Sequence, residues 1–254
     1  MCLINFQLND HEKYKLVMAA NRDEEYHRPT EPAKFWNDDM NVLAGRDLRG
    51  TGTWLGITRD GRISALTNIR NSDELLNTNL KTRGLLVSGF LQSESSAENY
   101  LSGLKAEAGE YSGFNLIAGS PDELYYLNNY ENEVQKIEDG IHGLSNHHLD
   151  TPWPKVLKGK QMLLKITSGK DIDMEALFSL LKDNDTAPEE DLPDTGLSNE
   201  LETQLSPLFI DTGNYGTRCS TVLVVDKEDN VEFIERTYEH GRLIDERQFA
   251  FTIR

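Results

Sequence analysis

The sequence predicts a four-layer αββα sandwich, an α+β fold in which two antiparallel β-sheets stack and helices cover both outer faces. The first observation is the order of segments along the chain, which runs strands, two helices, strands, two helices, strands. The second is that the strands are short and follow one another as hairpins, which favours antiparallel pairing. A doubly wound fold would instead alternate single strands and helices around a parallel sheet. A β-sandwich with peripheral helices is the alternative that this order allows.

The chain opens with strand signals only. Residues 2–8 and 14–20 are mostly apolar and flank a polar turn over residues 9–13, so we expect a hairpin. Residues 52–58 and 63–68 form a second pair, and the Asp-Gly step between them is typical of a tight hairpin turn. Four strands are therefore expected before the first helix.

Two helical blocks separate the runs of strands. Apolar residues recur at helical spacing within residues 82–92 and 96–107, and again within 153–166 and 171–182. Each pair of helices can cover one face of a sheet. Short apolar runs bounded by Gly, Pro, Asn or Asp predict further strands at residues 114–118, 123–127, 133–137, 140–144, 220–225, 231–238 and 248–253.

A single domain is expected over residues 1–254, since a chain of this length can bury a full core. Residues 183–206 hold Pro188, Pro193 and several carboxylates, a composition that predicts a mobile acidic loop. The alternative is that this loop forms a lid.

The composition argues against several classes of partner. The chain has 26 basic and 43 acidic residues and a formal net charge of -17, which repels phosphate backbones and anionic lipid surfaces. We expect no nucleic-acid binding and no membrane insertion. The first residues lack the basic start and long apolar stretch of a secretory signal, so a cytoplasmic location is expected. Cys2 and Cys219 are the only cysteines, which argues against a disulfide framework.

Cys2 is the most informative residue because it directly follows Met1. Removal of Met1 by an aminopeptidase, which a small second residue permits, would give Cys2 both a thiol nucleophile and its own α-amine as general base. A free α-amine titrates at about pH 8, roughly half a unit below a free thiol, so it can accept the thiol proton close to neutral pH. The alternative is a buried strand cysteine that packs as a small hydrophobic residue.

A series of short motifs runs through the whole chain. The first is Ala20-Asn21-Arg22-Asp23-Glu24, followed by Tyr26, Arg28 and Pro29. The others are Gly52-Thr53-Trp54-Leu55-Gly56, Thr67-Asn68-Ile69-Arg70, Arg83-Gly84, Gly113-Phe114-Asn115-Leu116, Leu144-Ser145-Asn146, Trp153-Pro154-Lys155 and Tyr215-Gly216-Thr217-Arg218. In order and spacing they resemble the NRDE family, also called the transport and Golgi organisation protein 2 family. The resemblance implies a fold similar to that of N-terminal nucleophile hydrolases.

Roles for individual residues come from this resemblance. Among cysteine amidases of that fold, the conjugated bile salt hydrolases and penicillin V acylases offer the closest functional comparison. The resemblance implies Cys2 as the nucleophile, Arg22 and Asp23 as the residues that hold its amine and thiolate, Asn68 or Asn115 as oxyanion donor, and Arg218 as the last member of the cluster. The candidate binding residues are Asn21, Trp54, Asn146 and Tyr215.

Arg22 and Asp23 depart from the amidase pattern because they are adjacent, whereas the amidases separate the two residues. Side chains of adjacent strand residues point to opposite faces, so only one of them need face Cys2 unless they lie on a turn. A surface ion pair in a hairpin turn is the alternative, and it would contribute only about 0 to 1 kcal/mol to stability.

Two functions follow as hypotheses. The first is a cysteine N-terminal nucleophile hydrolase, an amidohydrolase or thioesterase acting on a small acyl compound. The second is a non-enzymatic carrier of a hydrophobic small molecule, haem or acyl-CoA, since the family is linked to lipid and acyl-CoA metabolism and to haem trafficking. No cofactor and no metal site are expected, because the candidate histidines lack a zinc-type ligand spacing: His27, His142, His147 and His148.

Overall fold

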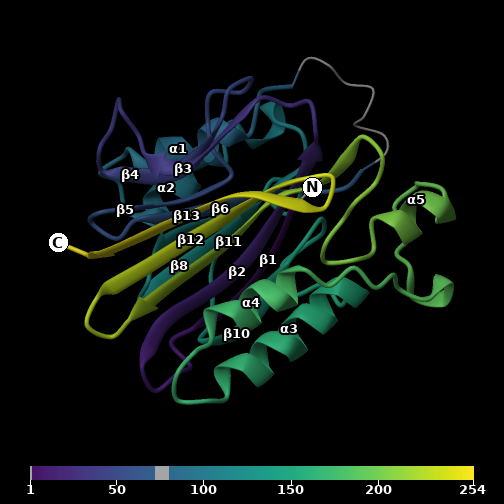
Figure 1. The fold of residues 1–254 in the computed structure, drawn as a ribbon. Coiled ribbons are helices and arrows are strands. Elements are labelled where there is room, and N and C mark those ends of the chain that lie inside the picture. Colours follow the sequence, from purple (N-terminus) through teal and green to yellow (C-terminus); the bar gives the residue numbers. More distant parts are fainter. Residues whose placement is uncertain (1, 72–79) are drawn as a thin grey trace.

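The computed structural model describes residues 2–71 and 80–254, which form two antiparallel sheets stacked between two pairs of helices (Figure 1). The predicted αββα order of layers is confirmed. One hydrophobic cluster fills the space between the sheets, and two further clusters fill the spaces between each sheet and its helices. The central strands of each sheet therefore bury both of their faces, whereas the edge strand β13 (Arg242–Thr252) is largely exposed.

The six-stranded sheet holds both ends of the described chain. Its strand order is β10-β1-β2-β11-β12-β13, and all five pairings are antiparallel. Its strands are β1 (Cys2–Leu8), β2 (Tyr14–Glu25), β10 (Gly140–Leu144), β11 (Tyr215–Asp226), β12 (Asn230–Glu239) and β13 (Arg242–Thr252). The expected opening hairpin is β1 and β2, which places Cys2 directly opposite Arg22.

The seven-stranded sheet runs in sequence order from β3 to β9. Its strands are β3 (Thr30–Phe35), β4 (Val42–Asp47), β5 (Leu55–Thr58), β6 (Ile63–Asn68), β7 (Phe114–Ser120), β8 (Glu123–Asn128) and β9 (Val134–Lys136). Six of the described strands thus precede α1 (Gly84–Leu91), so the prediction of four was wrong. The sequence signal of β3 is weak because Pro32 lies inside it. Proline is tolerated there because β3 is an edge strand whose pairing with β4 shifts register between Glu31 and Lys34.

Helices cover each sheet as predicted. On the seven-stranded sheet lie α1 (Gly84–Leu91) and α2 (Ala97–Leu104), and on the six-stranded sheet lie α3 (Pro154–Thr167) and α4 (Met174–Leu181) (Figure 1). Side-chain caps fix two of the starts: Ser96 accepts a hydrogen bond from the backbone of Asn99 before α2, and Asp173 accepts one from Glu175 before α4. Within the described residues, no helix is long and apolar enough to cross a membrane.

The alternation of side chains along β1 and β2 decides which residues reach the space between the sheets. Ile4, Met18 and Ala20 belong to the cluster between the sheets, whereas Leu3 and Ala19 belong to the cluster under α3 and α4. Continuing this period of two places the side chain of Arg22 between the sheets and that of Asp23 on the helix-covered side.

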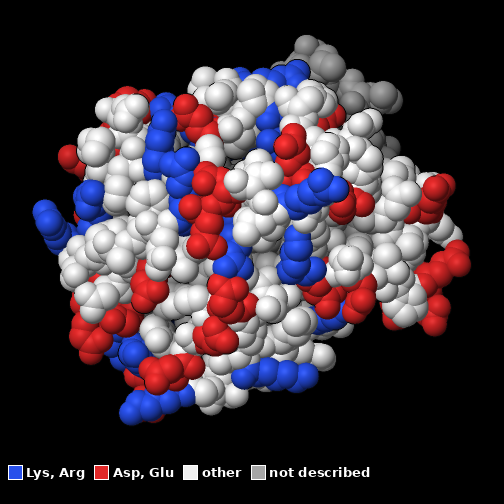
Figure 2. Space-filling view, in the orientation of Figure 1, with Lys and Arg blue, Asp and Glu red and all other residues white. Residues whose placement is uncertain are grey.

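The acidic segment contains a 3₁₀ turn (Glu189–Asp191) and the short helix α5 (Asn199–Gln204), which Ser198 caps. Glu202 of α5 is buried and pairs with Arg70, so the segment is attached to the body at this point. Its outer part is exposed, and acidic side chains gather at the edge of the molecule that carries α5 (Figure 2). The mobility expected for residues 183–206 stays a prediction.

Gly52 shows why one of the motifs requires glycine. A Cβ at this position would lie 2.2 Å from the carbonyl carbon of Gly84, at the start of α1. Because the obstacle is backbone, Gly52→Ala must displace the first turn of α1, and we expect it to lower the free energy of unfolding by about 1–3 kcal/mol. Gly103 in α2 is the matched control, since a Cβ there meets nothing within 4 Å. Gly103→Ala should stabilise the protein by about 0.5–1 kcal/mol in the same urea titration. Equal effects of the two substitutions would contradict this account.

Candidate active site

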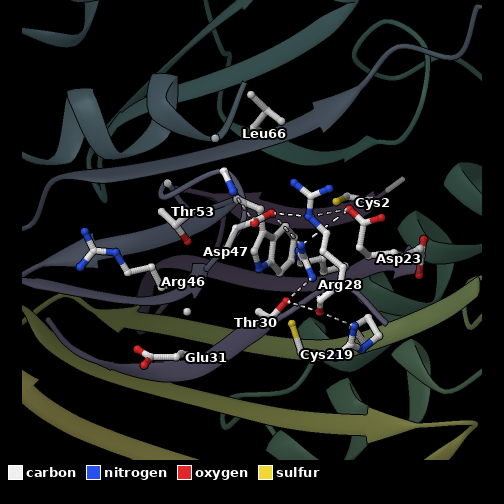
Figure 3. A pocket seen from close by; sticks show the side chains of 18 of the residues that line it. Cys2, Asp23, Arg28, Thr30, Glu31, Arg46, Asp47, Thr53, Leu66 and Cys219 are labelled. Atoms are coloured by element: carbon white, nitrogen blue, oxygen red, sulfur yellow. Dashed lines mark hydrogen bonds and ion pairs between the residues drawn. The ribbon is translucent and has the colours of Figure 1, made fainter. Parts of the chain in front are cut away.

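A cavity of about 150 Å³ lies between the two sheets at the end where β1 begins (Figure 3). The six-stranded sheet contributes residues from β1, β2, β11 and β12, and the seven-stranded sheet contributes residues from β3, β4 and β6 and from the start of α1. Of the predicted site residues, six line it: Cys2, Arg22, Asp23, Trp54, Asn68 and Arg218. The structure thus brings together residues from both ends of the chain.

Cys2, Arg22 and Cys219 form one row across three neighbouring strands. Cys2 pairs with Arg22 between β1 and β2, and Arg22 pairs with Cys219 between β2 and β11. Residues directly opposite each other in a sheet project from the same face, so all three side chains point into the space between the sheets, and all three line the cavity. Arg22 is therefore the residue that faces Cys2, and the two sulfurs lie on either side of it.

A network of opposite charges holds Arg22 in place. Its Nη2 atom lies 3.4 Å from Asp47 Oδ2 and 3.7 Å from Glu24 Oε2. Arg28 joins the network, with its Nε donating to the same Asp47 oxygen at 2.6 Å. Burial alone would raise the pKa of Asp47, but hydrogen bonds from the Gly50 backbone and from Arg28 hold this pKa below its ordinary value. The carboxylate therefore stays ionised and fixes both guanidinium groups.

Asp23 directs its carboxylate away from Cys2. Oδ1 accepts a 2.7 Å hydrogen bond from the Thr217 hydroxyl, and Tyr215 donates its phenol hydrogen to the Asp23 carbonyl at 2.9 Å. Burial raises the pKa of Asp23, and the positive charge of Lys155, on α3, opposes this effect. The side chains of Arg22 and Asp23 therefore lie on opposite sides of the sheet, as the alternation of side chains along a strand requires.

A buried charge cluster lies on the helix side of this sheet and consists of Asp23, Arg70, Lys155 and Glu202. Arg70 pairs with Glu202, while Lys155 donates to the Leu205 carbonyl at 3.1 Å. Asp23 and Lys155 are close enough for each to shift the pKa of the other. Burial and the neighbouring Arg70 lower the pKa of Lys155 to about 8.

Cys2 is only 7% exposed. Burial raises its pKa, and the negative charge of Asp23 acts in the same direction. Arg22 and a hydrogen bond from the Asp23 backbone lower it, because both favour the thiolate. The net shift is upward, so at neutral pH this thiol needs a nearby base to become a nucleophile.

Asn68 offers a hydrogen-bond donor inside the cavity. It ends β6 and lines the cavity, and within residues 2–71 and 80–254 its side-chain amide has no hydrogen-bond partner. Its backbone is fixed relative to Cys2 by two contacts from the segment after β10. Ser145 donates its hydroxyl hydrogen to the Cys2 carbonyl at 3.3 Å, and Asn146 donates to the Asn68 carbonyl at 3.0 Å.

The remaining predicted site residues lie outside the cavity lining. Asn115 is fully buried, and its amide donates to Thr67 and to the His147 carbonyl. Asn21 faces the helices and donates to the carbonyls of Leu181 and Leu208. Asn146 and Tyr215 contact the backbones of Asn68 and Asp23, so they support cavity residues without lining the cavity themselves.

Several cavity residues were not predicted from the sequence, among them Arg28, Asp47, Arg83 and Glu235. Arg28 and Arg83 lie within the motifs quoted above, and this position was the sequence signal that could have identified them as site residues. The only sequence signal for Glu235 is the alternation of side chains along β12, which places it on the same face as the inward-facing Val231 and Phe233. Together the lining holds five arginines (Arg22, Arg28, Arg46, Arg83, Arg218) and, apart from Asp23 with its carboxylate on the helix side, four acidic residues (Glu24, Glu31, Asp47, Glu235). The cavity is thus not acidic, although the chain has a formal net charge of -17.

Comparison with known proteins agrees with this architecture. The model of the family "Transport and Golgi organisation 2" matches residues 1–240. The transport and Golgi organization protein 2 homolog of Bos taurus is 37% identical, with 93% of each chain covered, and the human homolog is 33% identical, with 100% of this chain and 99% of the human protein covered.

Among solved structures, an N-acylethanolamine-hydrolyzing acid amidase ortholog from Caenorhabditis elegans superposes with a TM-score of 0.51 at 12% identity, covering 87% of this chain and 92% of that one. At this identity the likeness concerns the fold, which is that of N-terminal nucleophile hydrolases. Sequence and structure comparisons therefore agree: the chain belongs to the Transport and Golgi organisation 2 family and has an N-terminal nucleophile hydrolase-like fold.

Proposed function

We propose that this protein is a cysteine N-terminal nucleophile hydrolase that cleaves the amide or thioester bond of a small acyl compound. The observation that carries the proposal is the position of Cys2, which begins β1, lines the cavity and faces Arg22. A nucleophile at the first position of such a strand brings its α-amine to the same place, so both functional groups reach one substrate. Met1 lies outside the described residues, and its removal is part of the proposal.

The reaction would proceed in two stages. The α-amine of Cys2 accepts the thiol proton, and the thiolate, which the positive charge of Arg22 stabilises, attacks the acyl carbon. The carbonyl oxygen becomes an oxyanion that the amide of Asn68 stabilises by donating a hydrogen bond. The tetrahedral intermediate then expels the amine or thiol, which takes the proton from the α-ammonium group. Water attacks the resulting acyl-cysteine in the same way and releases the carboxylic acid and the free thiol.

The lining of the cavity supports an acyl substrate. Trp54, Leu66 and Pro32 provide an apolar wall beside the charged network. The name of the C. elegans neighbour refers to hydrolysis of an N-acyl amide, which is the bond type proposed here. An apolar acyl part would contact this wall while its carbonyl group lies between Cys2 and Asn68.

Thiol alkylation provides the first test. The chain has two cysteines of equal exposure, 7% each, so Cys219 is a matched internal control. Burial raises the pKa of Cys219 well above its ordinary value and raises that of Cys2 as well. With the α-amine free, we expect iodoacetamide to label Cys2 much faster than Cys219, at a rate that rises with pH as the thiolate fraction grows.

Intact mass spectrometry would follow the label and also show whether the first residue is Cys2. The fast label should persist in Cys219→Ala and disappear in Cys2→Ala. A screen of N-acyl amides and acyl thioesters on the same sample completes the test. Full retention of Met1 in cells, or equal labelling of both thiols, would contradict the proposal.

A carrier of haem or acyl-CoA is the alternative function, and the cysteine pair at the cavity is the observation that favours it, since thiolates bind haem iron. The cavity volume opposes it, because sites for ligands of that size commonly measure about 300–1,000 Å³. Titration with haem distinguishes the two functions. A saturable one-to-one absorbance change that is lost in Cys2→Ala, without turnover of any acyl compound, would favour the carrier.

A further inference from the structure

The end of the cavity farthest from Cys2 is polar, although it lies between the two sheets. Glu235 and Thr237 stand two residues apart on β12, so their side chains leave the same face of the strand, and both line the cavity. Thr237 pairs directly with Cys219, which also lines the cavity. Val231 and Phe233 occupy the equivalent positions earlier in β12 and pack in the apolar cluster between the sheets.

A buried hydroxyl without a hydrogen-bond partner among the described residues lies beside a buried carboxylate at this end of the cavity. Glu235 is only 2% exposed, and its Oε1 accepts a 2.6 Å hydrogen bond from the Ala33 backbone. Its carboxylate also interacts with the side chains of Cys219 and Thr221 on the neighbouring strand β11. The Thr237 hydroxyl is buried and has no hydrogen-bond partner in the described chain. Leaving a buried polar group unsatisfied costs stability, so the Thr237 hydroxyl indicates an interaction with something outside the protein, and the Glu235 carboxylate beside it can accept a further hydrogen bond from the same group.

The chemistry of the Thr237 hydroxyl and the Glu235 carboxylate defines which group would bind there. A carboxylate oxygen accepts hydrogen bonds, and a threonine hydroxyl both donates and accepts them. Arg22, the nearest positive charge in the row toward Cys2, is already paired with Asp47 and Glu24. The group that fits this corner therefore carries hydrogen-bond donors, as a hydroxyl or a primary ammonium group does.

We propose that Glu235 and Thr237 form a subsite that binds the hydroxyl- or amino-bearing end of the substrate whose acyl bond reacts at Cys2. This proposal rests on the proposed function. Strands β1 and β12 are three strand spacings apart, which amounts to about 14 Å across the sheet. The preferred substrate is therefore elongated, with its scissile bond at one end and its donor group at the other.

Chains of one length that differ only at their far end test the subsite. The probes are the N-acetylcysteamine thioesters of decanoic acid and of its ω-hydroxy and ω-amino derivatives. We expect the wild-type protein to prefer the ω-substituted thioesters over the decanoyl thioester by about tenfold or more in kcat/KM, which is the worth of a hydrogen bond to a charged acceptor.

Two conservative substitutions separate the donor types. Glu235→Gln retains an acceptor for the Ala33 backbone and removes the charge, so the preference for the ω-amino chain should fall about tenfold and that for the ω-hydroxy chain should fall less. Thr237→Val keeps the shape and should reduce the preference for the ω-hydroxy chain. Glu232→Gln is the control, since Glu232 lies on the same strand with its side chain exposed, and it should leave all three rates unchanged.

A binding measurement separates failure of the subsite from failure of the proposed hydrolase activity. Calorimetry on the Cys2→Ala variant with decanamide and ω-hydroxydecanamide reports on the subsite without any turnover. The Cys2→Ala variant should bind ω-hydroxydecanamide more tightly than decanamide, and this difference in affinity should be smaller in the double variant Cys2→Ala/Thr237→Val. Both results would support the subsite even if no thioester is hydrolysed. Turnover of all thioesters at equal rates, with equal binding of both amides, would overturn the subsite and leave the hydrolase intact.

Discussion

Replacing Cys2 by alanine is expected to lower the turnover of the acyl substrate by at least about a thousandfold, because the variant lacks the atom that forms the acyl intermediate. The α-amine, Arg22 and Asn68 all remain in Cys2→Ala, so substrate binding should change little. The loss should therefore appear in kcat rather than in KM. Steady-state kinetics with the best acyl thioester or amide from the screen would measure it.

The control for this experiment is the stability of the same variant. Cys2→Ala removes one sulfur atom from a position that already borders a cavity, so we expect a loss of about 1 kcal/mol or less in the free energy of unfolding. A folded Cys2→Ala protein that turns over substrate at the wild-type rate, in a preparation whose wild-type counterpart begins at Cys2, would exclude this residue as the nucleophile.

The largest effect on stability is expected from breaking the Arg70–Glu202 ion pair. The two side chains are 7% and 2% exposed. Glu202→Leu leaves the Arg70 guanidinium buried without its carboxylate, and removing one partner of a buried pair costs about 3–5 kcal/mol. Urea titration would measure the loss. Because Glu202 attaches α5 to the body, limited proteolysis should also show earlier cleavage within residues 183–206.

Two controls locate the cause of that loss. The double variant Arg70→Met/Glu202→Leu replaces both charges by apolar side chains and should recover much of the stability, since no uncompensated charge stays buried. Asp171→Asn breaks an exposed pair with Lys13, in which the side chains are 45% and 75% exposed, and should change stability by only about 0–1 kcal/mol. Similar losses of unfolding free energy in Glu202→Leu and Asp171→Asn would show that the burial of the Arg70–Glu202 pair contributes little to the effect.

The layers of the fold could be predicted from the sequence because hydrophobic periodicity and turn residues are local signals. The hairpin of β1 and β2 and the later hairpin of β11 and β12 have apolar runs and clear turns, and both appear in the structure. Strand β3 is stabilised by its neighbours and by the Glu235 carboxylate, which accepts from its backbone, more than by its own residues. Such a strand gives little signal in its own sequence.

The site could be predicted only in part for a related reason. Motifs identify residue types, and the alternation of β2 already indicated that Arg22 and Asp23 would separate. The pairing of Arg22 with Asp47 and the closeness of Glu235 to Cys219 depend on how the two sheets and their strands are placed. The motif around Asn115 predicts a site residue, but the Asn115 amide joins the loop after β10 to β7 and the residue does not line the cavity.

The row formed by Cys2, Arg22 and Cys219 has a consequence for oxidative chemistry. Two strand spacings separate the cysteine backbones by about 10 Å, whereas a disulfide requires Cα atoms within about 7 Å. The native sheet therefore prevents the two sulfurs from protecting each other through an internal crosslink. Peroxide that enters the cavity would convert each thiol separately to its sulfenic acid and then to irreversible oxygen acids, so preservation of Cys2 depends on cellular reductants or on an occupied cavity.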